Sequence, residues 1–344
     1  MIDFETPETH DSLPGTPHPA TTLDLFGHRA ILSELGHAFR AGRLHHGLLF
    51  EGPQGVGKAT LAFHLANHIL ASRDPADAPE TPGVPDPASP IFRQVAQNVH
   101  PSLRHISRPR NDAGTGWKTA ITVDEIRKIG RFMAMTAGDG LHRIVIVDAA
   151  GDMNRNAANA LLKSLEEPPP RALFILISHG SSRLLPTVRS RCQSVSFQPL
   201  GDDDLSRAFA AATGAPPDKT VLSHAEGSVR RALLFAGYGG MELAAAFDRI
   251  VDARAYPVAE AYKLATAASA RGEDIPFRLV SDHALARIRE SALAAARAGN
   301  LHSAARLAEA ESAFATRLAE ATAYNLDRKE EMLRLIAETH RALN

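Results

Sequence analysis

The chain has 344 residues, of which 44% are hydrophobic and 22% are charged. This length is sufficient for roughly two or three domains with cores of their own, and the composition is ordinary for a folded globular protein. The formal net charge of -1 excludes a protein that coats nucleic acid by overall attraction, so any contact with DNA requires a local basic patch.

Cysteine usage and hydropathy narrow the class further. The only cysteine, Cys192, excludes an internal disulfide and a cysteine-rich zinc site. No apolar run approaches the roughly 18–20 residues that a membrane helix needs. The first residues, MIDFETPETHDSLPGTPHPA, are acidic and rich in proline, unlike a signal peptide. We therefore expect a cytoplasmic protein without membrane contact, and a disordered tail over residues 1–21.

An α/β core is predicted over residues 22–197. It begins with an amphipathic helix in TTLDLFGHRAILSELGHAFRAGRL and continues as strand, glycine loop and helix through HGLLFEGPQGVGKATLAFHLANHIL. Residues 72–100 follow as an insertion with six prolines between Pro75 and Pro90. Because proline disfavours helix interiors and central strands, we expect this insertion to be exposed and without regular structure.

Strands and helices then alternate to the end of the core. Strands are expected in SLRHISR, HRIVIVD, ALFILIS and QSVSFQPL, and helices in VDEIRKIGRFMAM, NRNAANALLKSLEE and LLPTVRSRC. This alternation predicts a parallel sheet with right-handed crossovers. Residues 198–240 are expected to form a small helical lid. Residues 241–344, rich in alanine with repeating leucine and isoleucine positions, favour a separate helical domain.

The segment GPQGVGKAT is the strongest functional signal. Gly52, Gly57 and Lys58 meet the pattern G-x-x-x-x-G-K-[ST], in which backbone N–H groups and the lysine hold phosphates. Ala59, however, stands where a hydroxyl would hold magnesium, and Thr60 comes one residue too late to replace it. The flanking strand and helix favour a true phosphate site, because a helix N-terminus also attracts an anion.

The second signal is IVIVDAAGDM. Asp148 ends an apolar run that is expected to be a buried strand, and phosphate-loop ATPases use an aspartate at this position to hold magnesium. Ala149 follows it, where many such ATPases have a glutamate that orients the attacking water. The backbone from Gly55 to Ala59 would wrap the phosphates of ATP or ADP. Since the hydroxyl and the glutamate are both missing, we expect no hydrolysis by this chain alone. Binding of nucleotide, with or without Mg²⁺, stays open at this point.

Two arginine motifs each allow a functional and a structural interpretation. In LLPTVRSRC, Arg189 and Arg191 are either surface arginines or include a finger directed at the γ-phosphate of a neighbouring subunit. In GSVRRALLF, Arg230 or Arg231 either faces solvent or closes over phosphates of the same chain. The sixteen histidines show no metal-ligand spacing, so we assign no metal site to them.

With these residues in view, the chain resembles the delta-prime family of bacterial DNA polymerase III clamp-loader subunits. The resemblance runs through RLHHGLLFEGPQGVGKATLA, NAANALLKSLEEPP, LLPTVRSRC and GSVRRAL. It implies an AAA+ core and lid followed by an all-α collar that joins subunits into a ring. It also implies delta and gamma/tau subunits as partners, with the sliding clamp and primed DNA reached through the complex.

The resemblance also assigns roles to individual residues. Lys58 matches the phosphate-loop lysine, Asp148 the magnesium aspartate and Ser178 the polar residue that senses the γ-phosphate. Arg230 matches a lid arginine, and Arg191 matches the finger directed into an adjacent motor subunit. Many members of the family carry a four-cysteine zinc module where this chain has its proline-rich insertion, so zinc is not expected.

Three hypotheses for the function follow. The first is a largely non-hydrolysing clamp-loader subunit that donates an arginine finger and supplies collar contacts. The second is an active gamma/tau-type ATPase in which Ala59 and Ala149 are tolerated. The third is an unrelated phosphate-loop phosphotransferase, which would need an acceptor pocket and a base that the sequence does not indicate.

Overall fold

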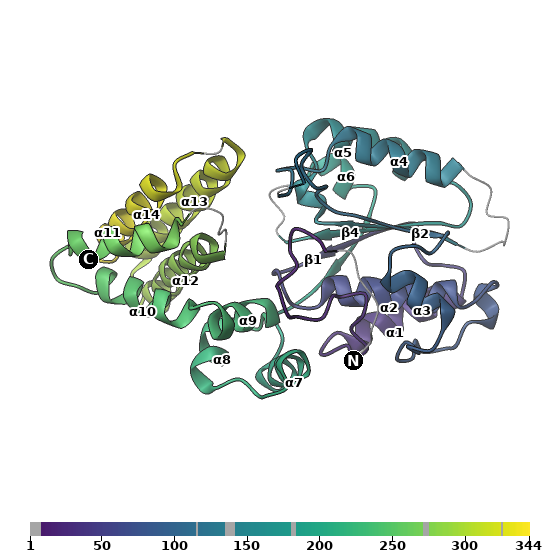
Figure 1. Cartoon of the computed structure of the whole chain (residues 1–344), viewed down its shortest axis with the longest axis horizontal. Helices are drawn as coiled ribbons and strands as arrows, with labels where there is room; N and C mark the ends of the chain where they lie inside the picture. Colours follow the sequence, from purple (N-terminus) through teal and green to yellow (C-terminus); the bar gives the residue numbers. More distant parts are fainter. Residues whose placement is uncertain (1–7, 115, 135–141, 180–183, 271–274, 325) are drawn as a thin grey trace. The chain divides into compact units, whose positions relative to one another are not determined.

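A computed structural model of the chain describes residues 8–114, 116–134, 142–179, 184–270, 275–324 and 326–344. The chain divides into two compact units (Figure 1). The first unit extends to Pro217 and includes Glu226–Arg230, whereas the second contains Asp218–Ala225 and Arg231–Asn344.

Within the described residues, the first unit is built around a five-stranded parallel sheet. Its strands are β1 (Gly47–Glu51), β2 (Leu103–Ile106), β3 (Arg143–Asp148), β4 (Ala172–Ser178) and β5 (Gln193–Ser196). They lie in the order β2-β3-β4-β1-β5, and every neighbouring pair is parallel. Glu51 pairs with Ser178 and Asp148 pairs with Ile177, so the carboxyl ends of β1, β3 and β4 meet at one edge. The predicted α/β core with a parallel sheet is confirmed.

Helices cover both faces of this sheet (Figure 1). One face carries α1 (Arg29–Arg40), α2 (Lys58–Leu70) and α3 (Pro90–Ala96), and the other carries α4 (Val123–Ala134), α5 (Arg155–Glu166) and α6 (Pro186–Arg189). Successive residues of β3 alternate between the two layers, with Ile144 and Ile146 in the first and Val145 and Val147 in the second. All four are fully buried, as expected for a parallel sheet covered on both faces.

The proline-rich insertion is more ordered than its composition predicts. Pro75–Asp77 forms a 3-10 helix (η1), and α3 begins at Pro90, inside the insertion. Proline is tolerated there because the first N–H of a helix has no partner within the helix. Phe92 and Val95 of α3 are buried. The prediction of an exposed segment without regular structure is therefore wrong for residues 90–96.

The sequence favours a disordered tail at the N-terminus, whereas residues 8–21 are folded against the first unit. The N–H of Ser12 donates to the carbonyl of Thr9 (3.0 Å), and the Thr16 hydroxyl donates to the carbonyl of Leu13 (2.7 Å), which makes two successive turns. Leu13 is only 6% exposed. The acidic, proline-rich composition does not predict this order, because the segment is also held by long-range contacts such as those of His10 with Asp152 and of Asp11 with Arg230.

The residues predicted to form a lid divide between the two units. Helix α7 (Asp202–Thr213) belongs to the first unit, where the Arg207 guanidinium lies 5.5 Å from the centre of the Phe26 ring. Helix α8 (Lys219–Ala225) and most of α9 (Val229–Gly237) belong to the second unit. The predicted boundaries of the lid at residues 198 and 240 stay predictions.

The second unit is helical throughout its described residues. Beyond α9 it contains α10 (Gly240–Val251), α11 (Val258–Ala268), α12 (Ile275–Arg297), α13 (Leu301–Tyr324) and α14 (Arg328–Leu343). Phe247, Ile288 and Ile336 share its core, and His283 Nε2 lies 2.9 Å from a carboxylate oxygen of Asp248 across α10 and α12. The predicted helical C-terminal part is confirmed. Across the ranges that the structure describes, no helix is both long and apolar enough to cross a bilayer.

We expect Phe247→Ala to destabilise the second unit by about 3–5 kcal/mol, because the surrounding helices cannot fill the space of a fully buried ring. Urea denaturation of the full chain, followed by circular dichroism, measures this change. Val258→Ala on α11 is the control, since Val258 is 69% exposed and its truncation should change stability by less than about 0.5 kcal/mol. Equal effects of the two changes would contradict the core described above.

Candidate functional site

The glycine loop connects the carboxyl end of β1 to the start of α2, as the sequence predicts. Gly55 and Gly57 have φ angles of 79° and 100°, in the left-handed region that favours glycine. A Cβ at Gly52 would meet the carbonyl oxygen of Phe197 at 2.3 Å. These glycines are therefore needed for the fold of the loop itself, whether or not a phosphate binds.

The first residues of α2 carry the chemistry of the loop. Lys58 is only 3% exposed, and its Nζ donates to the carbonyl oxygens of Gly52, at 2.7 Å, and Pro53. Burial lowers the pKa of Lys58 to about 8, while attraction from Asp148 opposes the fall. Ala59 packs against the core formed with α1 and α2, and Thr60 follows it one position along the helix. A lysine is thus present at the loop without a hydroxyl in the magnesium position.

Asp148 and Ser178 lie at the sheet edge next to the loop, at the ends of β3 and β4. Burial raises the pKa of Asp148 to about 7, and the charge of Asp11 raises it further, whereas His10 and Lys58 oppose the rise. His179 Nε2 lies 3.8 Å from Asp148 Oδ1, and Ser178 is 1% exposed. Near neutral pH the aspartate is therefore divided between its neutral and charged forms.

The beginning of α9 closes over the glycine loop from within the first unit. The Ser228 hydroxyl donates to the carbonyl of Gln54 (2.7 Å), and the N–H of Val229 donates to the carbonyl of Gly55 (3.0 Å). A Cβ added to Gly55 would lie 2.4 Å from the Cβ of Arg230. The structure thus brings Arg230, predicted as a lid arginine, to the loop that contains Lys58.

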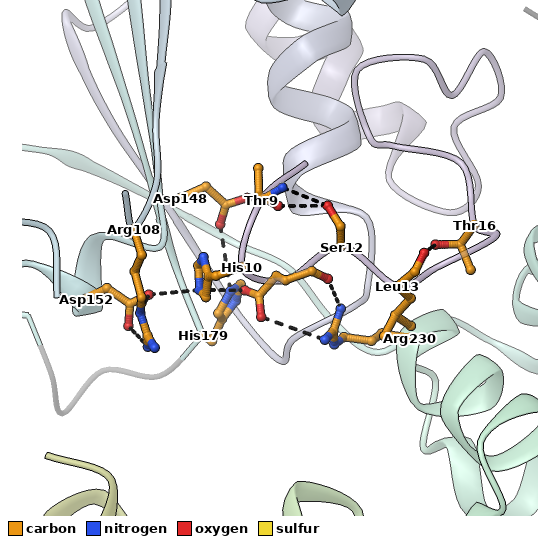
Figure 2. Close-up of polar contacts among 11 residues, drawn as sticks. Thr9, His10, Ser12, Leu13, Thr16, Arg108, Asp148, Asp152, His179 and Arg230 are labelled. Atoms are coloured by element: carbon orange, nitrogen blue, oxygen red, sulfur yellow. Dashed lines mark hydrogen bonds and ion pairs between the residues drawn. The ribbon is translucent and has the colours of Figure 1, made fainter. Parts of the chain in front are cut away.

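A polar cluster that the sequence does not predict joins His10 and Asp11 to this edge (Figure 2). His10 Nε2 lies 3.1 Å from Asp152 and 3.3 Å from Asp11, and the guanidinium of Arg108 donates to both carboxylate oxygens of Asp152 at 2.6–2.7 Å. Arg230 donates to the backbone carbonyl of Asp11. The only sequence signal was the second aspartate of DAAGDM, because His10 and Asp11 occur in a segment that resembles a disordered tail.

Arg191 lies at the opposite edge of the sheet. Its carbonyl oxygen would lie 3.3 Å from a Cβ added to Gly47, which is the first residue of β1. The glycine loop, in contrast, follows the last residue of β1. The Arg191 guanidinium pairs with Glu166 of α5 at 2.6 Å and donates to the Thr187 carbonyl at 2.9 Å. His45 and His46 line the same open hollow, whose volume is about 740 Å³. The structure thus separates Arg191 from the other predicted site residues.

Together the parallel sheet, the glycine loop and the aspartate at the end of β3 define a phosphate-loop protein with an AAA+ core. A family model described as DNA polymerase III, delta subunit, matches residues 27–201, just over half of the chain. The chain belongs to this family, and within the family it is delta-prime-like.

Curated relatives agree with this assignment over the first part of the chain. DNA polymerase III subunit delta' of Pseudomonas aeruginosa is 39% identical over 164 residues, 48% of this chain and 45% of that protein. Subunit delta' of Bacillus subtilis is 32% identical over 170 residues, 49% of this chain and 47% of that protein. Subunit tau of Escherichia coli is 30% identical over 182 residues, 53% of this chain and 26% of that protein. The chain thus spans less than half the length of these relatives.

The raised pKa of Asp148 predicts a pH dependence of stability. A carboxyl group whose pKa is higher in the folded than in the unfolded protein stabilises the fold below its unfolded pKa, and this contribution is lost as pH rises through the folded value. With a folded pKa of about 7, the wild-type chain should lose about 2 kcal/mol relative to Asp148→Asn between about pH 5.5 and pH 8. Urea denaturation of both chains at the two pH values measures this. Identical pH dependence would show that the buried carboxyl is already ionised at the lower pH.

Proposed function

We propose that this chain is a non-hydrolysing stator of the clamp loader that donates Arg191 to the ATP site of a neighbouring subunit. The observation that carries the proposal is the position of Arg191 at the edge of the sheet opposite the chain's own glycine loop. Five residues of β1 separate the two edges, a distance of roughly 16 Å at about 3.3 Å per residue. A guanidinium there is suited to a phosphate held by another chain.

The immediate surroundings of Arg191 support this role. Its side chain is 36% exposed, and that of its partner Glu166 is 47% exposed. An ion pair between exposed groups contributes only about 0–1 kcal/mol. Glu166 therefore holds the guanidinium without fixing it strongly. Exchange of this carboxylate for a γ-phosphate would cost little, and bidentate pairing with phosphate is the geometry to which arginine is best suited.

The chain's own loop supports the other half of the proposal. Ala59 and Ala149 provide neither the magnesium hydroxyl nor a group that orients water, so the loop lacks two parts that phosphoryl transfer uses. The anion-binding parts, Lys58 and the glycine turns, are present and fit a nucleotide phosphate. We therefore propose that the site binds ATP or ADP without turnover, with Asp148 as a carboxylate available to Mg²⁺.

The proposed partners are the delta and gamma/tau subunits, with the sliding clamp and primed DNA as the substrates of the whole complex. The similarity to a tau subunit keeps one alternative, an active gamma/tau-type ATPase. The two functions differ in one observable property, which is ATP turnover by the isolated chain.

We expect Arg191→Ala to slow hydrolysis at the neighbouring site by about 10³-fold or more, the usual effect of removing an arginine finger. The test reconstitutes the chain with delta and gamma/tau subunits, a sliding clamp and primed DNA, and measures ATP turnover of the complex and of the isolated chain. The isolated chain should be inactive. The ATP turnover of the complex should fall by the fraction that the affected site contributes to the total. Gel filtration should show that the complex still assembles.

Arg189→Ala is the matched control for this experiment. Arg189 is the last residue of α6, two positions before Arg191, and it pairs with Glu51 of the same chain at 3.0 Å. Removal of its side chain should therefore leave the ATP turnover of the complex unchanged. Arg191→Lys, which keeps the charge but loses the two-pronged donor, should recover only part of the rate. ATP hydrolysis by the isolated chain, together with no effect of Arg191→Ala, would instead identify a gamma/tau-type motor.

A further inference from the structure

The N-terminal segment, residues 8–16, lies at the carboxyl edge of the sheet between Asp148 and Arg230 (Figure 2). We propose that this segment is an internal competitor of nucleotide, in which Asp11 occupies the lid arginine that would otherwise contact phosphate. The inference rests on the proposed nucleotide site and not on the role of Arg191, which lies at the opposite edge.

The contact with Arg230 is the first observation. The guanidinium donates to the backbone carbonyl of Asp11, and its Nη2 lies 3.8 Å from the Asp11 carboxylate. The side chain of Arg230 is only 16% exposed, and its Cβ sits next to Gly55 of the loop. Asp11 thus presents a negative charge and oxygen acceptors to this arginine, which is the same chemistry that a phosphate offers.

The second observation is the anchoring of the segment on its other side. His10 lies against Asp152, whose two oxygens are also held by Arg108, and the side chains of His10 and Asp152 are each only 9% exposed. Two successive turns, closed by Ser12 and Thr16, hold the backbone around Asp11. The position of Asp11 therefore depends on several contacts that act together, and not on one exposed ion pair.

The charges around the segment explain how it would compete. Asp11 and Asp152 place negative charge beside Asp148, so the phosphates of an entering nucleotide must first rearrange this edge. Lys58 is meanwhile bonded to carbonyls of its own loop. A nucleotide must therefore separate Asp11 from Arg230 before the lid arginine can contact its phosphates. Its apparent Kd is the intrinsic Kd divided by the fraction of chains in which Asp11 has left Arg230.

The test measures binding of a fluorescent ATP analogue, in the presence of Mg²⁺, to the full chain and its variants. Asp11→Asn removes the charge but keeps the backbone carbonyl, so its affinity should rise by about threefold. A chain that begins at residue 17 loses the whole segment and should bind about tenfold tighter or more. Addition of Lys58→Ala to Asp11→Asn should abolish the gain, because the phosphate loses its lysine.

Asp112→Asn is the matched control. Asp112 pairs with Lys118 at 2.8 Å and its side chain is 93% exposed, so the change removes the carboxylate of an exposed ion pair. Its affinity should equal that of the wild-type chain. Circular dichroism of every variant shows whether the fold is kept, and Asp11→Asn serves as the test if the shortened chain does not fold.

The failures of the two proposals can be told apart. If the wild-type chain binds the analogue and both N-terminal variants bind it equally well, the segment does not compete, although the nucleotide site stands. If no variant binds the analogue, the nucleotide site itself is refuted and the competitor with it. Hydrogen exchange supplies a second readout: residues 8–16 should exchange faster when the wild-type chain is saturated, and unchanged exchange would also overturn the inference.

Discussion

The candidate nucleotide site depends on charged groups that have little access to water at the carboxyl edge of a parallel sheet. Lys58 is almost inaccessible, and Asp148 ends a strand whose apolar residues are fully buried, so water cannot stabilise either charge well. In such surroundings a charged group needs a partner or a shifted pKa. Loop carbonyls supply acceptors for Lys58, and Asp148 responds with a raised pKa. The contacts of His10 and Arg230 continue the same compensation toward the surface.

The two edges of the sheet have different electrostatic roles. At the carboxyl edge, His10, Asp152 and Arg230 make ion pairs and hydrogen bonds within the chain. At the amino edge, Arg191 is restrained only by an exposed partner and faces an open hollow beside His45 and His46. One edge therefore contains ion pairs made within the chain, whereas the other retains a group suited to a ligand outside the chain. This division is consistent with a subunit that acts on its neighbours.

Local sequence patterns predicted the sheet and the loop, because β1, β3 and β4 are short buried runs in a chain that alternates strands with amphipathic helices. Helix α3 was not predicted, because the segment before it is rich in proline. Pro90 is compatible with a helix only because it occupies the first turn, and the sequence alone does not show where that turn begins. The contact between Asp11 and Arg230 joins residues 219 positions apart. No periodicity within a single segment records such a contact, so the competitor could be found only from the structure. The motif also gave no means to place Arg191 on one edge or the other.

The attachment of the Arg191 backbone to the central sheet has a mechanical consequence. Its backbone packs against the first residue of β1, and the strand that follows it, β5, is hydrogen-bonded along β1. The arginine is therefore fixed to the central sheet, not carried on a long surface loop. A rotation of this unit against a neighbour would move the base of the guanidinium as part of one solid body. Small changes in the angle between subunits would then be transmitted to the side chain almost without loss.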